Sequence, residues 1–132
     1  MYDLVYASHV LEHVPWNRVN DALGEVFRVL RPGGEFEVWV PDFAYIVDCY
    51  LARRCGDQWR RFNPEGDPMK WVNGRVFTYG PKDGNWHHGC FDERYLAQCL
   101  SESGFVDVNA IPKRLRGVSH GEIDLGMRGF KP

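Results

Sequence analysis

The sequence has little net charge and no long hydrophobic run. Among its 132 residues, 16 Lys and Arg nearly balance 18 Asp and Glu, which leaves a formal net charge of −2. A chain this close to neutral has no overall field that would attract nucleic acid or an anionic membrane. Its apolar runs are far shorter than the ~20 residues of a membrane-spanning helix, and Asp3 stands where a secretory signal would be basic. We therefore expect a cytoplasmic protein with neither nucleic-acid nor membrane partners.

Two common motifs are also missing. The four cysteines include no Cys-x-x-Cys pair, which favours reduced thiols over disulfides. There is no Gly-x-Gly-x-x-Gly, and Gly33-Gly34 follows a predicted helix rather than a strand, so it indicates a turn and not a phosphate cradle. The 44% hydrophobic content still suits a folded globule, and the length predicts a single domain, 1–132.

The first forty residues have the pattern of a strand, a helix and a second strand. Strand formers occupy Asp3 to Ala7 and Phe36 to Val40. Between them we predict a helix over 17–31, which Asn17 caps and the turn 31–34 ends. The apolar stripe of this helix comprises Val19, Leu23, Val26, Phe27 and Leu30. Strands joined through a helix are normally parallel neighbours in one sheet. The chain therefore opens inside an α/β sheet.

The rest of the chain predicts two more helices and two more strands. Asp42 and Asp92 are suitable N-caps for helices 43–55 and 93–103, and strands are expected over 105–111 and 123–130. The first of these helices has a predicted apolar face of Phe43, Ile46, Val47, Tyr50 and Leu51, and the second is expected to turn Leu96, Cys99 and Leu100 inward. Residues 57–91 are rich in aromatics without periodicity, which indicates an ordered insertion or a lid.

Four segments together resemble a known family. They are Tyr-Asp-Leu-Val-Tyr-Ala-Ser-His-Val-Leu-Glu-His-Val at 2–14, Glu-Val-Phe-Arg-Val-Leu-Arg-Pro-Gly-Gly at 25–34, Val-Pro-Asp at 40–42 and Gly-Phe-Val-Asp-Val at 104–108. This combination resembles the class I S-adenosylmethionine-dependent methyltransferases, of the small-molecule, type 11-like kind. The resemblance implies half of a Rossmann-like sheet with strand order 4-5-7-6, an antiparallel last strand and helices mainly on one face. The family's first three strands and its glycine-rich loop precede these motifs, so the chain corresponds to the C-terminal half.

The resemblance also implies a reaction and its residues. The reaction is methyl transfer from S-adenosylmethionine to a small-molecule or glycan-like acceptor. Ala7, Ser8, His9 and Val10 would lie beside the cofactor, and His13 would be catalytic, by positioning the acceptor or taking its proton. Trp86, His87 and His88 would line the acceptor pocket. Because most of the family's cofactor contacts lie upstream, we expect weak or absent cofactor binding by this chain alone.

Other interpretations of these residues remain open. His13 could simply hydrogen-bond the backbone, and Trp86 could belong to a small satellite core with surface histidines. His9 and His13 are four residues apart and suggest metal binding, but without a close ligand pair of known spacing we assign no metal ligand. The alternative function is a non-catalytic truncated remnant that acts as a binding or assembly module.

The absent N-terminal half has consequences for the surface. Glu35, Glu37 and Trp39 share one strand face, which we expect on the same side as Asp124 and Arg128. The family's helices over that face are missing, so Trp39 would be exposed unless something else covers it. The strand from Asp3 to Ala7 would have an open apolar edge. We therefore expect a homodimer, formed through this edge or through the uncovered sheet face.

Overall fold

The computed structural model describes residues 1–56, 60–78 and 85–132. Its centre is a four-stranded sheet in the order β1-β2-β6-β3. The strands are β1 (Tyr2–Ser8), β2 (Leu30–Pro41), β3 (Val106–Ala110) and β6 (Asp124–Phe130). Strands β1 and β2 are parallel, and β6 lies antiparallel between β2 and β3. The predicted α/β class is confirmed, with the last strand inserted antiparallel.

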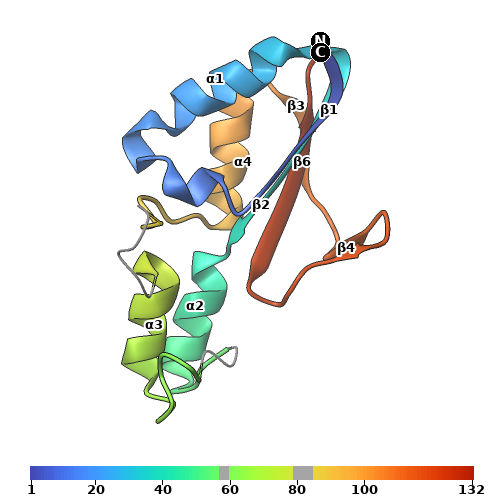
Figure 1. Cartoon of the computed structure of the whole chain (residues 1–132). Helices are drawn as coiled ribbons and strands as arrows, with labels where there is room; N and C mark the ends of the chain where they lie inside the picture. The colour runs from blue at the N-terminus through green and yellow to red at the C-terminus, as the bar shows by residue number, and fades with distance from the viewer. Residues whose placement is uncertain (57–59, 79–84) are drawn as a thin grey trace.

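Two helices cover one face of this sheet. Helices α1 (Val19–Val29) and α4 (Glu93–Glu102) lie together on the same side in Figure 1. They pack on the inward-facing side chains of β2 and β6 and form the main core, whose buried members include Val19, Leu23, Phe36, Val38, Val40, Leu96, Cys99, Leu100, Leu125 and Met127. The residues predicted to face inward from α1 and α4 are therefore largely the ones that the core contains, because apolar residues at helical spacing lie on one face of a helix.

The boundaries of α1 differ from the prediction at both ends. A 3-10 turn, η2 (Trp16–Arg18), precedes α1. The N-cap of α1 is Arg18, whose side chain makes no capping hydrogen bond, so the predicted cap Asn17 is wrong. The helix ends at Val29, and β2 already begins at Leu30. Gly33, with φ +79°, lies within β2 and donates its N–H to the Lys131 carbonyl at 2.8 Å. The predicted turn at 31–34 is therefore an irregular start of the strand.

Helices α2 (Phe43–Leu51) and α3 (Pro68–Phe77) form a pair beyond one end of the sheet (Figure 1). Asp42 caps α2 as predicted, since its carboxylate accepts a hydrogen bond from the Ala44 N–H. The predicted apolar face of α2 is wrong in part: Leu51 is 70% exposed, whereas Cys49 is buried. The cause is α3, whose fully buried Trp71 packs on Ile46 and Cys49.

Helix α3 occupies part of the predicted insertion 57–91, for which no helix was predicted. Its N-terminus has a recognisable signal, because Asp67 caps it by accepting a hydrogen bond from Lys70 N–H and Pro68 stands in its first turn. Residues 57–59 and 79–84 of the insertion lie outside the described residues. Within the part of the chain that is described, no helix is long and apolar enough to cross a membrane.

A short hairpin covers the opposite face of the sheet. Its strands are β4 (Arg114–Leu115) and β5 (Val118–Ser119), and it lies on the side away from α1 and α4 (Figure 1). The His120 ring stacks on Trp39 at 3.5 Å with an interplanar angle of 8°, and Trp39 is fully buried. The expectation of an uncovered face is therefore wrong around Trp39, and residues 112–121 supply the cover that this side chain required.

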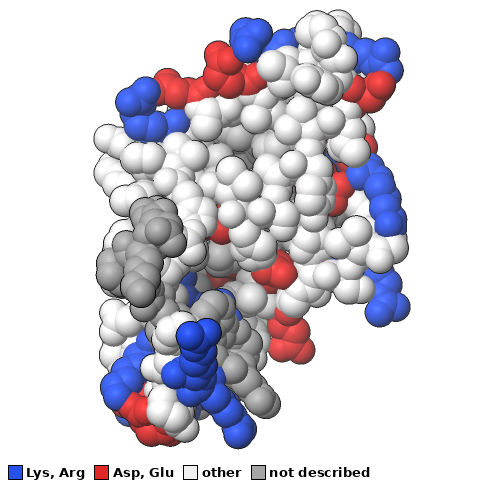
Figure 2. Space-filling view, in the orientation of Figure 1, with Lys and Arg blue, Asp and Glu red and all other residues white. Residues whose placement is uncertain are grey.

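Glu37 and Arg128 lie on the same face, as predicted, because they are directly opposite each other in the β2–β6 ladder. The cation that pairs with the glutamates is nevertheless Arg116 of the hairpin. Its guanidinium contacts the Glu37 carboxylate at 2.5 Å and that of Glu35 at 2.9 Å. Elsewhere on the surface, the face in Figure 2 shows Lys and Arg interspersed with Asp and Glu near its two ends and along its right edge, around a largely uncharged middle.

Candidate functional site

The candidate site begins where β1 and β2 end side by side. Ser8 is paired with Trp39 across the two parallel strands, and the His9 N–H donates to the Trp39 carbonyl at 2.9 Å. His9 then has φ +55°, which turns the chain out of the sheet into the 3-10 turn η1 (Leu11–His13). Open α/β sheets bind their ligands at the carboxyl ends of parallel strands. The loop after β1 therefore lies where a ligand is expected.

His9 lies between two carboxylates. Its Nε2 is 3.1 Å from Asp124 Oδ1 and its Nδ1 is 3.3 Å from Glu12 Oε1. The hydrogen bond with Asp124, and then the contact with Glu12, raise the pKa of His9 to about 10. His9 is therefore an imidazolium at neutral pH and cannot serve as a base there.

Asp124 is held ionised by the same contacts. Burial alone would raise the pKa of this carboxyl, but hydrogen bonds from His9 and from the Gly121 N–H outweigh burial and lower it. The His9–Asp124 contact ties the loop after β1 to the start of β6.

His13 joins the loop after β1 to a distant segment, 85–90. Its Nδ1 lies 3.1 Å from the Trp86 carbonyl, 73 residues away, and its ring meets the His87 ring edge-on with centroids 4.8 Å apart. The backbone makes the same junction, since the His88 N–H donates to the Glu12 carbonyl at 2.8 Å. The structure thus brings together the residue predicted as catalytic and those predicted to bind the acceptor.

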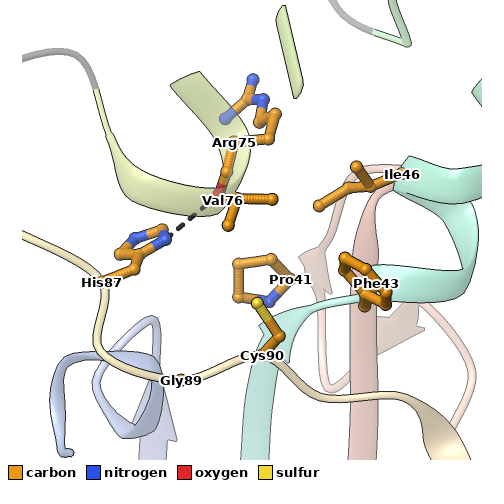
Figure 3. A pocket seen from close by; sticks show the side chains of 8 residues that line it. All are labelled: Pro41, Phe43, Ile46, Arg75, Val76, His87, Gly89 and Cys90. Atoms are coloured by element: carbon orange, nitrogen blue, oxygen red, sulfur yellow. Dashed lines mark hydrogen bonds between the residues drawn. The ribbon is translucent and has the colours of Figure 1, made fainter. Parts of the chain in front are cut away.

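His87 is held on its other side by α3. Its Nδ1 lies 3.2 Å from the Arg75 carbonyl, the bond drawn as a dashed line in Figure 3. Burial is the main cause that lowers the pKa of His87, so its imidazole is neutral at pH 7. His87 and His88 both line a pocket of about 270 Å³, together with Trp16, Val76, Phe77, Gly89 and Cys90. Trp86 is absent from this lining and contributes its carbonyl to His13 instead.

The predicted cofactor-binding residues differ in how far they can reach a ligand. Ala7 is half-buried and packs against the main core, and Ser8 is also half-buried. Val10, by contrast, has 54% of its surface exposed just beyond the end of β1. Among these residues, Val10 is the side chain best placed to touch a ligand at the sheet edge.

Glu12 is the residue that the sequence did not reveal. Its side chain is only 1% exposed, and within residues 1–56, 60–78 and 85–132 neither carboxylate oxygen has a hydrogen-bond partner. His9 Nδ1 lies 3.3 Å from its Oε1, and His13 Nε2 lies 3.9 Å from the same oxygen. Nothing in a loop sequence distinguishes a buried glutamate from a solvated one. The available signal was its position between two histidines, His9 and His13.

Comparisons with known proteins agree with this architecture. Residues 1–38 match the model of the family described as Methyltransferase domain. No curated protein matches the sequence. The fold is similar to that of the S-adenosylmethionine-dependent methyltransferase SibL, with a TM-score of 0.59 and 18% identity over 99% of this chain and 31% of that one. The predicted resemblance to S-adenosylmethionine-dependent methyltransferases is confirmed by the family match and the fold.

Two further solved structures show the same partial coverage. Human N-acetylserotonin methyltransferase in complex with S-adenosylmethionine has a TM-score of 0.55 and 16% identity over 98% of this chain and 29% of that chain. A protein from Bordetella parapertussis, described as possibly exported, has a TM-score of 0.59 and 20% identity over 99% of this chain and 39% of that chain. The chain therefore spans about a third of the length of these proteins.

Proposed function

We propose that this chain forms the acceptor side of an S-adenosylmethionine-dependent methyltransferase that acts on a small-molecule or glycan-like acceptor. The methyltransferase-domain match over residues 1–38 supports the reaction class, and the fold supports it over the rest of the chain. The solved relative with bound S-adenosylmethionine supports the choice of methyl donor. These matches do not favour a purely non-catalytic remnant.

One observation carries the proposal: the loop after β1 and the segment 85–90 lie against each other. His13 contacts the Trp86 carbonyl and the His87 ring, and the Trp16 N–H donates to the His88 carbonyl at 3.1 Å. A methyl donor at the end of β1 would therefore lie beside the pocket that His87 and His88 line. Methyl transfer needs donor and acceptor aligned in one site, and such positioning accounts for much of its catalysis.

The residues at the end of β1 fit only part of a cofactor. When bound, S-adenosylmethionine supplies an electrophilic methyl group. The exposed Val10 side chain offers an apolar contact, and the Ser8 hydroxyl offers a hydrogen bond at the edge of the sheet. In the family that the chain resembles, most cofactor contacts come from segments upstream of these motifs, so this chain alone compensates poorly for the cofactor's loss of freedom on binding. We therefore expect a dissociation constant weaker than about 0.1 mM for this chain alone.

His13 is suited to act on the acceptor. A carbonyl oxygen can only accept a hydrogen bond, so the contact with Trp86 fixes the proton on Nδ1 and leaves the lone pair on Nε2. That nitrogen can orient an acceptor hydroxyl or accept its proton as the methyl group is transferred. The neighbouring pocket, at about 270 Å³, has room for a small acceptor group.

The test is NMR titration of the isotope-labelled chain with S-adenosylhomocysteine. We expect weak, saturable shifts confined to Ser8–His13 and the ends of β1 and β2. Val10→Glu should abolish them, whereas Val118→Glu, a matched change at an exposed valine of the hairpin, should preserve them. Shifts that are absent, or that lie elsewhere, would overturn the proposal. Micromolar binding would support the site but contradict the expected weakness.

A further inference from the structure

Three side chains at the junction of the β1 loop and the segment 85–90 have the spacing of a metal site. One potential ligand atom from each of Glu12, His13 and His87 lies within 4.8 Å of the other two. The residues come from two segments more than seventy positions apart in the sequence. The backbone bond from His88 N–H to the Glu12 carbonyl, at 2.8 Å, holds the segments together without using any of the three side chains.

Both histidines are held in the tautomer that leaves Nε2 unprotonated. His13 donates from Nδ1 to the Trp86 carbonyl, and His87 donates from Nδ1 to the Arg75 carbonyl (Figure 3). In each ring the lone pair is therefore on Nε2. A metal-binding histidine commonly donates its other N–H to a backbone carbonyl or a carboxylate, which fixes the ring orientation. Here two rings in edge-to-face contact are both fixed in this way.

The environment of Glu12 supports a bound cation independently of the ligand spacing. The Glu12 carboxylate is 99% buried, yet neither oxygen has a hydrogen-bond partner among the residues that the structure describes. A buried carboxylate without hydrogen bonds is costly, and buried charges are normally paired or coordinate a metal. The imidazolium of His9 lies 3.3 Å from Oε1 and offsets part of this cost, but it does not satisfy Oε2.

We propose that Glu12, His13 and His87 bind one divalent transition-metal ion, with Zn²⁺ as the best fit. A carboxylate oxygen and two imidazole nitrogens are a donor set that zinc accepts in tetrahedral geometry. In such a site the ligand atoms are about 3.3 Å apart. Glu12 Oε1 and His13 Nε2 are already at 3.9 Å. The widest spacing, 4.8 Å, would have to close by about 1.5 Å when an ion binds.

Three protein ligands leave the fourth position of a tetrahedral ion open for water or a ligand. His87 also lines the 270 Å³ pocket, so that position lies near the place where a small molecule would bind. The inference does not rest on the proposed function. With a metal bound, His13 would act as a ligand and not as a proton acceptor.

The test is a zinc competition titration of the metal-free chain against a chromophoric chelator. We expect one Zn²⁺ per chain and at least a hundredfold loss of affinity in His87→Ala. The matched control is His88→Ala, which removes an exposed histidine from the same segment and should change the affinity less than threefold. Equal losses in the two variants, or no stoichiometric binding at micromolar zinc, would overturn the proposal.

A second variant separates ligand loss from misfolding. Glu12→Gln keeps the side-chain volume and removes the buried charge, so the metal-free variant should unfold at the same temperature as the parent or higher. Zinc should raise the unfolding temperature of the parent but not of Glu12→Gln. Co²⁺ should give a tetrahedral absorption spectrum without a thiolate charge-transfer band. Such a band, lost in Cys90→Ser, would instead assign the ion to the Cys90 thiol and overturn the proposed ligand set.

Discussion

Adding one methyl group at Gly126 should destabilise the fold by overpacking Trp39. A Cβ at this position would lie 2.5–2.6 Å from three carbons of the indole ring. The ring has little room to move, because His120 stacks on it at 3.5 Å and its Nε1 donates to Glu37 Oε1 at 2.9 Å. Overpacking of this kind costs about 1–3 kcal/mol. For a domain of this size the melting temperature should fall by about 3–5 °C per kcal/mol.

The measurement is urea denaturation of Gly126→Ala followed by circular dichroism. The matched control is Gly24→Ala in α1, where an added Cβ meets nothing within 4 Å. That substitution should stabilise the chain by about 0.5–1 kcal/mol, since alanine is the better helix former. The mechanism itself is tested in a Trp39→Phe background, where the smaller ring leaves space and Gly126→Ala should cost much less. An undiminished cost there, or no cost in the parent, would refute this reasoning.

Three further predictions concern the hairpin, the ion pair at β6 and the strand edge. Arg116→Ala should lower the urea midpoint more than Arg128→Ala, because it deprives the buried Glu37 carboxylate of its cation, and equal effects would count against that pairing. The pKa of the Asp124 carboxyl is lowered in the folded state. Its contribution to stability is therefore fully present above the unfolded pKa of about 3.9 and is lost as the pH falls through the folded pKa. The stability difference between the parent and Asp124→Asn should therefore be constant from about pH 5 to 6 and shrink below pH 4, whereas a difference unchanged down to pH 2 would contradict the lowered pKa. If chains pair through β1, sedimentation should show a dimer that Leu4→Lys dissociates, since Leu4 is 41% exposed on the strand next to β2, and a monomeric parent at high concentration would exclude the pairing.

The sequence predicted the elements whose signals are local. Apolar spacing gave the inward faces of α1 and α4, and the N-caps Asp42 and Asp92 are observed with their expected hydrogen bonds. Helix α3 was missed, although Asp67-Pro68 is a recognisable start, because its buried surface centres on Trp71 without a continuous stripe. Leu51 was placed on the buried face of α2 for the same reason, because the buried side of α2 depends on where α3 packs.

The candidate site was predictable only in part. Sequence placed His13 and His87 in separate functional segments, but their contact depends on how residues 85–90 return to the β1 loop. The burial of Glu12 depends on the tertiary structure around its loop, and the pKa of His9 depends above all on Asp124, which comes from β6. Such long-range contacts have no fixed spacing in the sequence. Local patterns therefore indicated which residues matter but not how they interact.

The hairpin that covers Trp39 can open locally while the rest of the domain stays folded. The hairpin has little buried apolar surface of its own, since Val118 is 48% exposed and Arg116 is also exposed. A segment held by a few polar contacts opens with a smaller free energy than the whole domain. Its release would hydrate the Glu37 carboxylate and the Trp39 indole while α1 and α4 stay packed on the other face. Backbone amides of the hairpin should therefore exchange with solvent faster than those of β2, the strand that the hairpin protects.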